Sequence, residues 1–383
     1  MNRNAGGIQS AEALDTGAAA CDSFAFRCAA GAGDNDMTQQ EALKEFVELV
    51  RARDASRTMT ALIVDSPWLP GYAGVPTMDF LFDPSVWLDV YTRAQRDLDG
   101  AVLIPGAWAE LGMAAEPTGF GSPVSWNVSG PPDLRPHPAG LAGLVQMDPP
   151  DPEKDGLMPL ILRQYERLAP QMRARGFAPR IAGARGPLAV AAHLLGVTDF
   201  LMATQLEREA CLALLERTTE TCIAWLKAQL RRMDEPAGVL VLDDLVGMLG
   251  PEDAEAIAFP MLKRVFDAFP GLIHIFHNDT PNDSGYGGLA GCGVDVFNFS
   301  HETDIVAARA KVGPDVVLMG NLPPLALLVR GTPEESRAAT GALLARLPAA
   351  GPILVSPGGG VSPGTKLENL QTVIRAVGDA MGG

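Results

Sequence analysis

The sequence predicts a single distorted (β/α)8 barrel of the TIM type, and three observations support this fold. Short apolar runs, each as long as a buried parallel strand, alternate about eight times with segments of helical length. Polar residues follow these runs, as expected at the carboxyl ends of barrel strands, where active sites lie. The length of 383 residues suits one large barrel.

The composition of the chain argues against some classes of function. The chain is 47% hydrophobic and 20% charged, which is typical of a soluble globular protein. Its net charge of −16 argues against nucleic acid or an anionic membrane as the main partner, since both attract basic surfaces. The five cysteines show no metal-type spacing, which indicates reduced thiols and a cytoplasmic location. No apolar run approaches the length of a membrane span.

The first 36 residues differ from the rest. They are rich in small and polar residues without periodicity, so we expect a disordered leader or a stretch read from an upstream start codon. An amphipathic helix follows over 41–53, with Thr38 as its N-cap. The barrel is therefore predicted to occupy residues 37–383.

The strands and helices can then be assigned in order. The predicted strands are 60–64, 100–104, 180–184, 237–242, 272–276, 294–301, 316–319 and 353–356. The predicted helices are 41–53, 84–98, 157–176, 198–203, 207–233, 251–269, a segment after Pro281, 305–311, 332–347 and 366–381. The Gly/Pro-rich segment 117–139 is long enough to be a lid or binding loop.

The most informative segment is the predicted strand that ends in His277-Asn-Asp279. Residues two apart in an extended chain point to the same side, so His277 and Asp279 can share a metal ion or a proton. His301 ends the next predicted strand in the same way. Alternatively, each histidine bonds only a loop carbonyl, and Asn-Asp forms a turn. His274, inside the strand, is expected to be a packed core residue.

Other polar residues follow the remaining strands. Asp65, Glu110, Asp243 and Asp244 are candidate catalytic acids or bases. Glu110 could instead be a solvated loop carboxylate. The pair Asp243-Asp244 could orient His277 or cap the helix before Leu245. Arg185 is a candidate carboxylate-binding residue or a structural ion-pair partner.

Several motifs together resemble the uroporphyrinogen decarboxylase superfamily. They are Phe259-Pro260, Met319-Gly-Asn-Leu-Pro-Pro324, Gly331-Thr-Pro-Glu-Glu335, Ser356-Pro-Gly-Gly-Gly-Val-Ser-Pro-Gly-Thr365 and Glu368-Asn369. The superfamily contains decarboxylases of the porphyrin pathway and zinc-dependent methyltransferases that take methyl groups from corrinoid proteins. The resemblance extends from about Met37 to the end of the chain and implies a distorted (β/α)8 barrel.

The decarboxylase branch fits poorly at its functional positions. The arginines of its signature loop are replaced here by Ile63 and Pro67, although a porphyrinogen with many carboxylates needs such cations. The loop that carries the branch's catalytic aspartate matches Ile104-Pro-Gly106. Its late Gly-His-Gly matches Gly358-Gly-Gly360, so that histidine is also absent.

The methyltransferase branch fits better but is altered. Its zinc-binding His-x-Cys resembles His277-Asn-Asp279, and its late cysteine falls at Gly359. Replacing thiolates by carboxylate makes a bound metal harder and better suited to oxygen donors than to a thiol acceptor such as coenzyme M. Glu110 matches a Glu-x-x-Gly-like position of this branch.

The resemblance therefore implies a metal-assisted methyltransferase that uses a corrinoid on a separate protein, since the chain lacks a corrinoid-base signature. His277, Asp279 and His301 would hold zinc or another divalent metal. The residues expected to contact a small-molecule substrate are Trp68, Tyr72, Trp108, Phe120, Arg185 and Asn321. The superfamily also suggests a homodimer. A decarboxylase or lyase that acts on a small acid, and a non-catalytic ligand-binding barrel, are the alternatives.

Removal of the leader provides a first test. A chain that begins at Met37 should keep the barrel, and its melting temperature should change by less than about 2 °C, because a segment without apolar periodicity buries few contacts. Thermal melts and limited proteolysis of both chains measure this. Aggregation, or a decrease of about 10 °C, would show that the segment packs on the barrel or bridges two copies.

Overall fold

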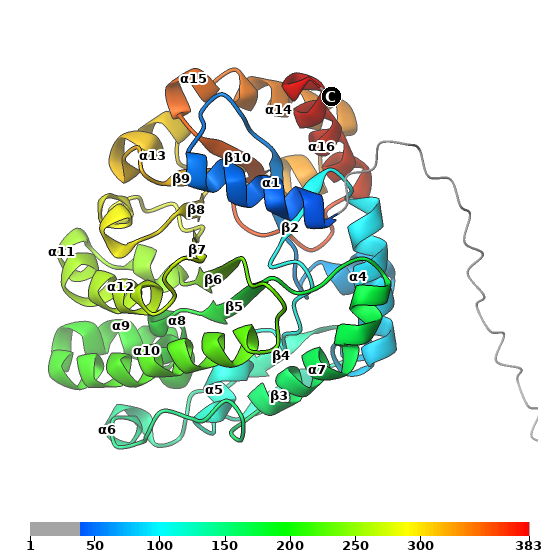
Figure 1. The fold of residues 1–383 in the computed structure, drawn as a ribbon. Helices are drawn as coiled ribbons and strands as arrows, with labels where there is room; N and C mark the ends of the chain where they lie inside the picture. The colour runs from blue at the N-terminus through cyan, green and yellow to red at the C-terminus, as the bar shows by residue number, and fades with distance from the viewer. Residues whose placement is uncertain (1–38, 383) are drawn as a thin grey trace, which may run out of the picture. The chain divides into compact units, whose positions relative to one another are not determined.

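The computed structural model describes residues 39–382, in which eight parallel strands form a nearly closed barrel (Figure 1). The strands are β1 (Thr60–Ile63), β2 (Ala101–Ile104), β5 (Ile181–Arg185), β6 (Gly238–Leu242), β7 (Ile273–Asn278), β8 (Val296–Phe299), β9 (Val317–Leu322) and β10 (Ile353–Pro357). Their order is β2-β1-β10-β9-β8-β7-β6-β5. The predicted (β/α)8 barrel is confirmed. The predicted leader and the Thr38 cap lie outside the described residues.

Helices surround the sheet. The longer ones are α1 (Gln39–Ala52), α4 (Pro84–Asp97), α7 (Met158–Ala174), α8 (Pro187–Leu195), α9 (Val197–Leu206), α10 (Arg208–Leu230), α12 (Phe259–Asp267), α13 (Ile305–Val312), α14 (Pro333–Leu344) and α16 (Leu367–Met381). A capping box formed by Thr332 and Glu335 begins α14. Among residues 39–382, no single helix is long and apolar enough to cross a membrane, and only α8 with α9, bent by 107°, passes that test as a pair.

The inside of the barrel is filled with apolar side chains. Alternate residues of the strands point inward, and α1 contributes Phe46 and Leu49 to the same buried cluster. Arg51 of α1 donates to the carbonyl of Gly271 before β7, and Arg53 donates to that of Asp315 before β9. Helix α1 therefore closes the amino-terminal end of the barrel, and polar chemistry is left to the opposite end.

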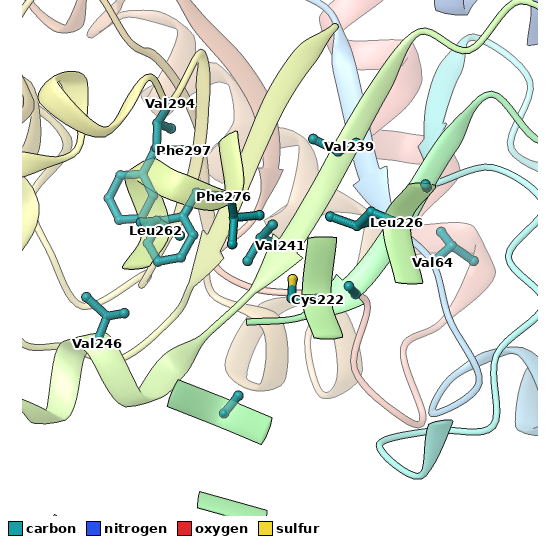
Figure 2. Packing of buried hydrophobic residues seen from close by; sticks show 14 of the residues in the cluster. Val64, Cys222, Leu226, Val239, Val241, Val246, Leu262, Phe276, Val294 and Phe297 are labelled. Carbon is teal, nitrogen blue, oxygen red and sulfur yellow. The ribbon is translucent and has the colours of Figure 1, made fainter. Parts of the chain in front are cut away.

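A second apolar layer lies between the sheet and the helices. Figure 2 shows Val239 and Val241, on the outward face of β6, with Cys222 and Leu226 of α10 in one buried cluster. Cys222 is fully buried. This outer layer fixes the position of each strand, because large and small side chains interlock across it.

The barrel is incomplete between β2 and β5, which form the two ends of the strand order. The ring of Trp108 lies in this seam, because a Cβ atom at Gly183 of β5 would be 2.7 Å from it. Side chains take the place of the missing strand pairing. Gln229 of α10 donates to the Gly183 carbonyl at 2.8 Å and accepts from its N–H at 3.4 Å. Gln39 of α1 donates to the Ala101 carbonyl of β2 at 2.9 Å.

Two sequence expectations need correction, and the predicted lid or binding loop contains regular structure. The helix predicted after Pro281 is wrong: the segment contains only short turns, Tyr286–Gly288 and Ala290–Cys292, because its many glycines disfavour a helix. The helix predicted over 251–269 contains a wide π turn over Ala254–Ala258, just before Pro260, whose ring cannot follow a regular helical turn. The segment 117–139 contains a hairpin, β3 (Val124–Asn127) and β4 (Gly130–Leu134).

The two hydrogen bonds between Gln229 and Gly183 predict the effect of a mutation at Gln229. Gln229→Met keeps the size of the side chain but leaves the Gly183 N–H and C=O buried without partners. Unfolding in urea should show a loss of about 2–4 kcal/mol. Gln205→Met, a matched change at an exposed position of α9, should cost less than about 1 kcal/mol. Equal losses in the two variants would contradict this role for Gln229.

Candidate active site

The polar residues of the barrel gather in one layer at its carboxyl-terminal mouth. Each occupies the inward position that follows the last inward apolar residue of its strand. They are Asp65 after β1, Arg185 of β5, His277 of β7, Asn298 of β8, Asn321 of β9 and Ser356 of β10. The alternation of the strands therefore brings residues from distant parts of the chain to one surface.

A group that could hold a metal ion lies on one side of this layer. Ligand atoms of Asp244, His277 and Asp279 all lie within 4.8 Å of one another. The Nε2 atom of His277 is 3.6 Å from Oδ1 of Asp244, and the same oxygen accepts the Asp279 N–H at 3.2 Å. The predicted proximity of His277 and Asp279 is present, and Asp244 completes the group.

The donor set fits a divalent cation. Two ligands bound at about 2 Å in a tetrahedral site are separated by about 3.3 Å, close to the His277–Asp244 distance. The other ring nitrogen of His277, Nδ1, is 2.7 Å from Oδ1 of the buried Asn298, so Nε2 is the atom directed to the carboxylates. Zinc accepts this combination of imidazole and carboxylate ligands.

Gly359 leaves room for the Asp279 carboxylate. A Cβ atom at Gly359 would lie 2.6 Å from Oδ2 of Asp279, and the glycine has φ of +117°, which other residues rarely adopt. The position that matches the late cysteine of the methyltransferase branch thus faces the group directly. With a carboxylate in this space and this backbone, a side chain at 359 does not fit.

His301 is not part of the group of three. It is exposed just beyond β8, although its charge reaches Asp279. Loss of hydration raises the pKa of the Asp279 carboxyl, and the charges of His277 and, more weakly, His301 oppose the rise. The role of His301 as a ligand stays a prediction. His274 is packed as expected: its ring stacks on Phe266 and its nitrogens lie 2.8 and 2.9 Å from backbone carbonyls.

A cluster of buried acids surrounds Arg185 at the seam. Asp65, Glu110 and Glu116 are 9%, 7% and 2% exposed. Glu110 accepts the Ser66 N–H at 2.7 Å through one oxygen, and its other oxygen lies 3.8 Å from the Arg185 guanidinium. Glu116 accepts the Arg185 N–H at 2.8 Å. Three carboxyl groups thus share one guanidinium away from water.

This cluster favours retention of a proton. Burial raises the pKa of Asp65 to about 8, the charge of Glu110 adds to the rise, and Arg185 opposes it. Burial likewise raises the pKa values of Glu110 and Glu116, against Arg185 and backbone N–H donors. The physical cause is that two or three anions beside one cation are costly in a medium of low dielectric constant. A carboxyl group that holds a proton near neutral pH can act as a general acid.

Asp243 faces away from the metal-binding group. Its carboxylate accepts the Leu188 N–H of α8 at 2.9 Å, and its own N–H donates to the His277 carbonyl at 3.0 Å. It therefore anchors the start of α8. Of the predicted pair Asp243-Asp244, it is Asp244 that lies beside Nε2 of His277, and Asn298 contacts Nδ1.

The predicted substrate-contacting residues have varied positions. Trp68 is 1% exposed and donates to the Thr365 carbonyl, and it stacks on Tyr72, whose hydroxyl donates to Asp97. Both residues thus pack the loop after β1 rather than line the mouth. Asn321 donates to the Ser300 and Thr303 carbonyls and so holds the loop after β8.

Trp108 remains close to the chemistry. It is 4% exposed, and Arg185 lies over its ring at 5.7 Å. A small cavity beside it is lined by Glu110, Glu116 and Arg185. Phe120 is also buried.

Two residues of the mouth are not found by the sequence reasoning, Asn298 and Glu116. The signal for Asn298 is its place between Phe297 and Phe299, both of which face the outer layer, so that the residue between them must face inward. Glu116 lies in an irregular segment without periodicity and has no such signal.

The fold and the mouth define a (β/α)8 barrel with its candidate site at the carboxyl ends of the strands, and comparison with known proteins identifies the family. The sequence model of the family "Uroporphyrinogen decarboxylase (URO-D)" matches residues 89–380. The chain therefore belongs to the uroporphyrinogen decarboxylase family, as the motifs predicted.

Both branches occur among its relatives. The chain is 27% identical over 229 residues to the methylated-thiol–coenzyme M methyltransferase of Methanosarcina mazei, covering 58% of this chain and 59% of that protein. It is 29% identical over 201 residues to the methylcobamide:CoM methyltransferase MtbA of Methanosarcina acetivorans, covering 51% and 57%. It is 28% identical over 233 residues to the uroporphyrinogen decarboxylase of Carboxydothermus hydrogenoformans, covering 59% and 64%. These matches span about three-fifths of the relatives.

A solved structure shows the same fold. A methyltransferase from Methanosarcina mazei superposes with a TM-score of 0.71 at 17% identity, covering 90% of this chain and 99% of that chain. At this identity the likeness supports the barrel fold alone.

The acid cluster predicts how stability depends on pH. Asp65 has a folded pKa of about 8, whereas an unfolded chain releases the proton near pH 4, so stability should fall as pH rises from about 4 to 8. Asp65→Asn should make the melting temperature fall less steeply over this window. Part of the slope should remain, because burial also raises the pKa of Asp243 to about 8.

Thermal melts at pH 5, 6.5 and 8 measure the slope. Asp54→Asn is the control, because hydrogen bonds from Ser56 lower the pKa of this exposed carboxyl, and it should leave the slope unchanged. Identical slopes for the wild type and Asp65→Asn would contradict proton retention at Asp65.

Proposed function

We propose that this chain is a metal-dependent methyltransferase that transfers a methyl group to or from a corrinoid carried by a separate protein. The observation that carries the proposal is the group of Asp244, His277 and Asp279 at the barrel mouth. The two Methanosarcina relatives, whose names describe methyl transfer, support it. The homodimer and the cytoplasmic location stay predictions.

The donor set favours a substrate that carries oxygen. Two carboxylates and one imidazole would hold a harder ion than a set with thiolates. When bound, such an ion would polarise a substrate oxygen as a Lewis acid. Asp244 and Asp279 would balance its charge, and His277 would supply the nitrogen ligand.

The acid cluster would manage the proton of the same reaction. Removal of a methyl group from oxygen leaves an oxyanion that needs a proton, and Asp65 can hold one near neutral pH. Loss of hydration and the charge of Glu110 would keep that proton on Asp65, against the opposing charge of Arg185, until an anion forms nearby. Trp108 would provide an apolar wall that excludes water from this side of the mouth.

Decarboxylation of a small acid is the second candidate, and it depends on a cation for the substrate carboxylate. Arg185 is the predicted residue, but Glu110 lies 3.8 Å from its guanidinium, and its side chain is only 11% exposed. A substrate carboxylate would have to compete with Glu110. The structural ion-pair interpretation of Arg185 is therefore favoured over a substrate-binding one.

Metal analysis tests the proposal directly. Purified wild-type protein should retain about one equivalent of a divalent metal, and the double variant of His277→Ala and Asp279→Ala should retain less than about a tenth. His137→Ala, outside the barrel mouth, is the control. His301→Ala tests the remaining predicted ligand: loss of metal would place His301 in the site.

Turnover separates the alternatives. The wild type should consume the methyl–cobalt absorption of a methylated corrinoid or generate it from a methoxylated substrate. Release of carbon dioxide from a panel of small acids, without any change of the corrinoid, would support the decarboxylase instead. A wild-type protein without metal or turnover, but with a copurified ligand, would indicate a binding barrel.

A further inference from the structure

Asn298 is a fully buried amide at the end of β8, and its three hydrogen-bonding contacts fix its orientation. Its Nδ2 atom donates to the Met319 carbonyl of β9 at 3.0 Å and to the Pro357 carbonyl of β10 at 3.3 Å. Both acceptors are backbone oxygens, which cannot donate. A flipped amide would place Oδ1 against these two oxygens and lose both bonds. The Oδ1 atom must therefore face His277.

This orientation determines which nitrogen of His277 carries the proton. The Nδ1 atom of His277 is 2.7 Å from Oδ1 of Asn298, and an amide oxygen can only accept. Nδ1 must therefore be the donor. In a neutral ring the other nitrogen, Nε2, then has a free lone pair, and it is this atom that lies 3.6 Å from Asp244.

We propose that Asn298 is a positioning residue that holds His277 in the Nδ1–H tautomer and so presents Nε2 to a divalent cation. The inference rests on the proposed function, because the cation is the one assigned to Asp244, His277 and Asp279. A partner on the second ring nitrogen fixes both the tautomer and the ring plane of a metal-binding histidine, and here an amide has this role.

The position of Asn298 also ties the ligand to the barrel. Through one side chain, β8 is bonded to β9 and β10, while His277 comes from β7. The ring of His277 is thereby held by the rigid strands rather than by a loop. Asp244 and Asp279, which follow strand ends, supply the more adaptable ligands.

The experiment uses three single variants of the full chain. Asn298→Ala removes the contact, and Asn298→Asp keeps an acceptor for Nδ1–H while losing both donors. Ser336→Ala is the matched control, because Ser336 is also fully buried and its hydroxyl has no partner among residues 39–382, but it belongs to α14 and not to the polar layer of the mouth. Circular dichroism and melting temperature verify that each variant is folded.

The tautomer is measured first, on metal-free protein near pH 8 by long-range proton–nitrogen NMR. The chain has five histidines, and His277→Gln assigns the signal. The wild type, Ser336→Ala and Asn298→Asp should show Nδ1–H, and Asn298→Ala should show a mixture with Nε2–H. A wild-type ring that carries its proton on Nε2, or an unchanged tautomer in Asn298→Ala, would overturn the role of Asn298.

Zinc affinity is measured next, by competition with a chromophoric chelator. Asn298→Ala should weaken binding about 10- to 100-fold, and Asn298→Asp should remain within about tenfold of the wild type. Ser336→Ala should bind zinc as the wild type does. A folded Asn298→Ala that keeps the wild-type Kd would overturn the inference. A wild type that shows the Nδ1–H tautomer but binds no zinc would overturn the proposed metal site instead, so the two failures are distinguishable.

Discussion

The sheet does not close between β2 and β5. The edge N–H and C=O groups of these two strands need other hydrogen-bonding partners, and those partners determine where buried polar side chains lie. Along an edge strand of a parallel sheet, every second residue has N–H and C=O groups that no neighbouring strand bonds. When these groups are buried, they need other partners. On β5 the groups of Gly183 bond Gln229, and the N–H of Arg185 bonds Glu116. A carboxylate is thus brought into the core to complete a strand edge. Glu116 in turn requires Arg185 nearby, because an unpaired buried anion is costly.

The filled interior confines the chemistry to one layer. Within residues 39–382, α1 and the inward residues of the strands fill the deeper part of the barrel with apolar side chains. The polar residues of the mouth follow this apolar layer along each strand. The register pairs His277 with Asn298 and Asn321 with Ser356, so these residues are neighbours at the mouth although they are distant in sequence. A rigid strand positions such a side chain more firmly than a loop does.

Much of the fold follows from the sequence, and less of the site does. Alternating apolar runs and helical segments predict the barrel, and residues two apart on one strand predict that His277 and Asp279 are neighbours. The same alternation, applied to Phe297 and Phe299, points to Asn298. Continued past the strand ends, the alternation also places Asp244 in phase with the inward Leu240 and Leu242, and His301 in phase with the outward Phe297 and Phe299. The distance from Asp244 to His277 depends on the backbone after β6, which the alternation does not describe. Glu116 depends on the open seam, which is a property of the whole sheet and has no local signal.

The charges of the mouth connect its two halves. Asp244 and Asp279 face the imidazole of His277, and Asp65, Glu110 and Glu116 face one guanidinium, so each half holds more carboxyl groups than basic groups. At the seam, where water is excluded, a carboxyl group can relieve this excess by keeping a proton. At the more open half, where Asp279 is exposed, a divalent cation can relieve it with two oxygens and the Nε2 lone pair. In the proposed reaction the cation and the protonated carboxyl group would act on the same substrate oxygen. The cation would draw electron density from this oxygen, and the proton would neutralise it once the methyl group has left. Neither half alone could do both, since a cation bound among the seam acids would displace the proton that the leaving oxygen needs.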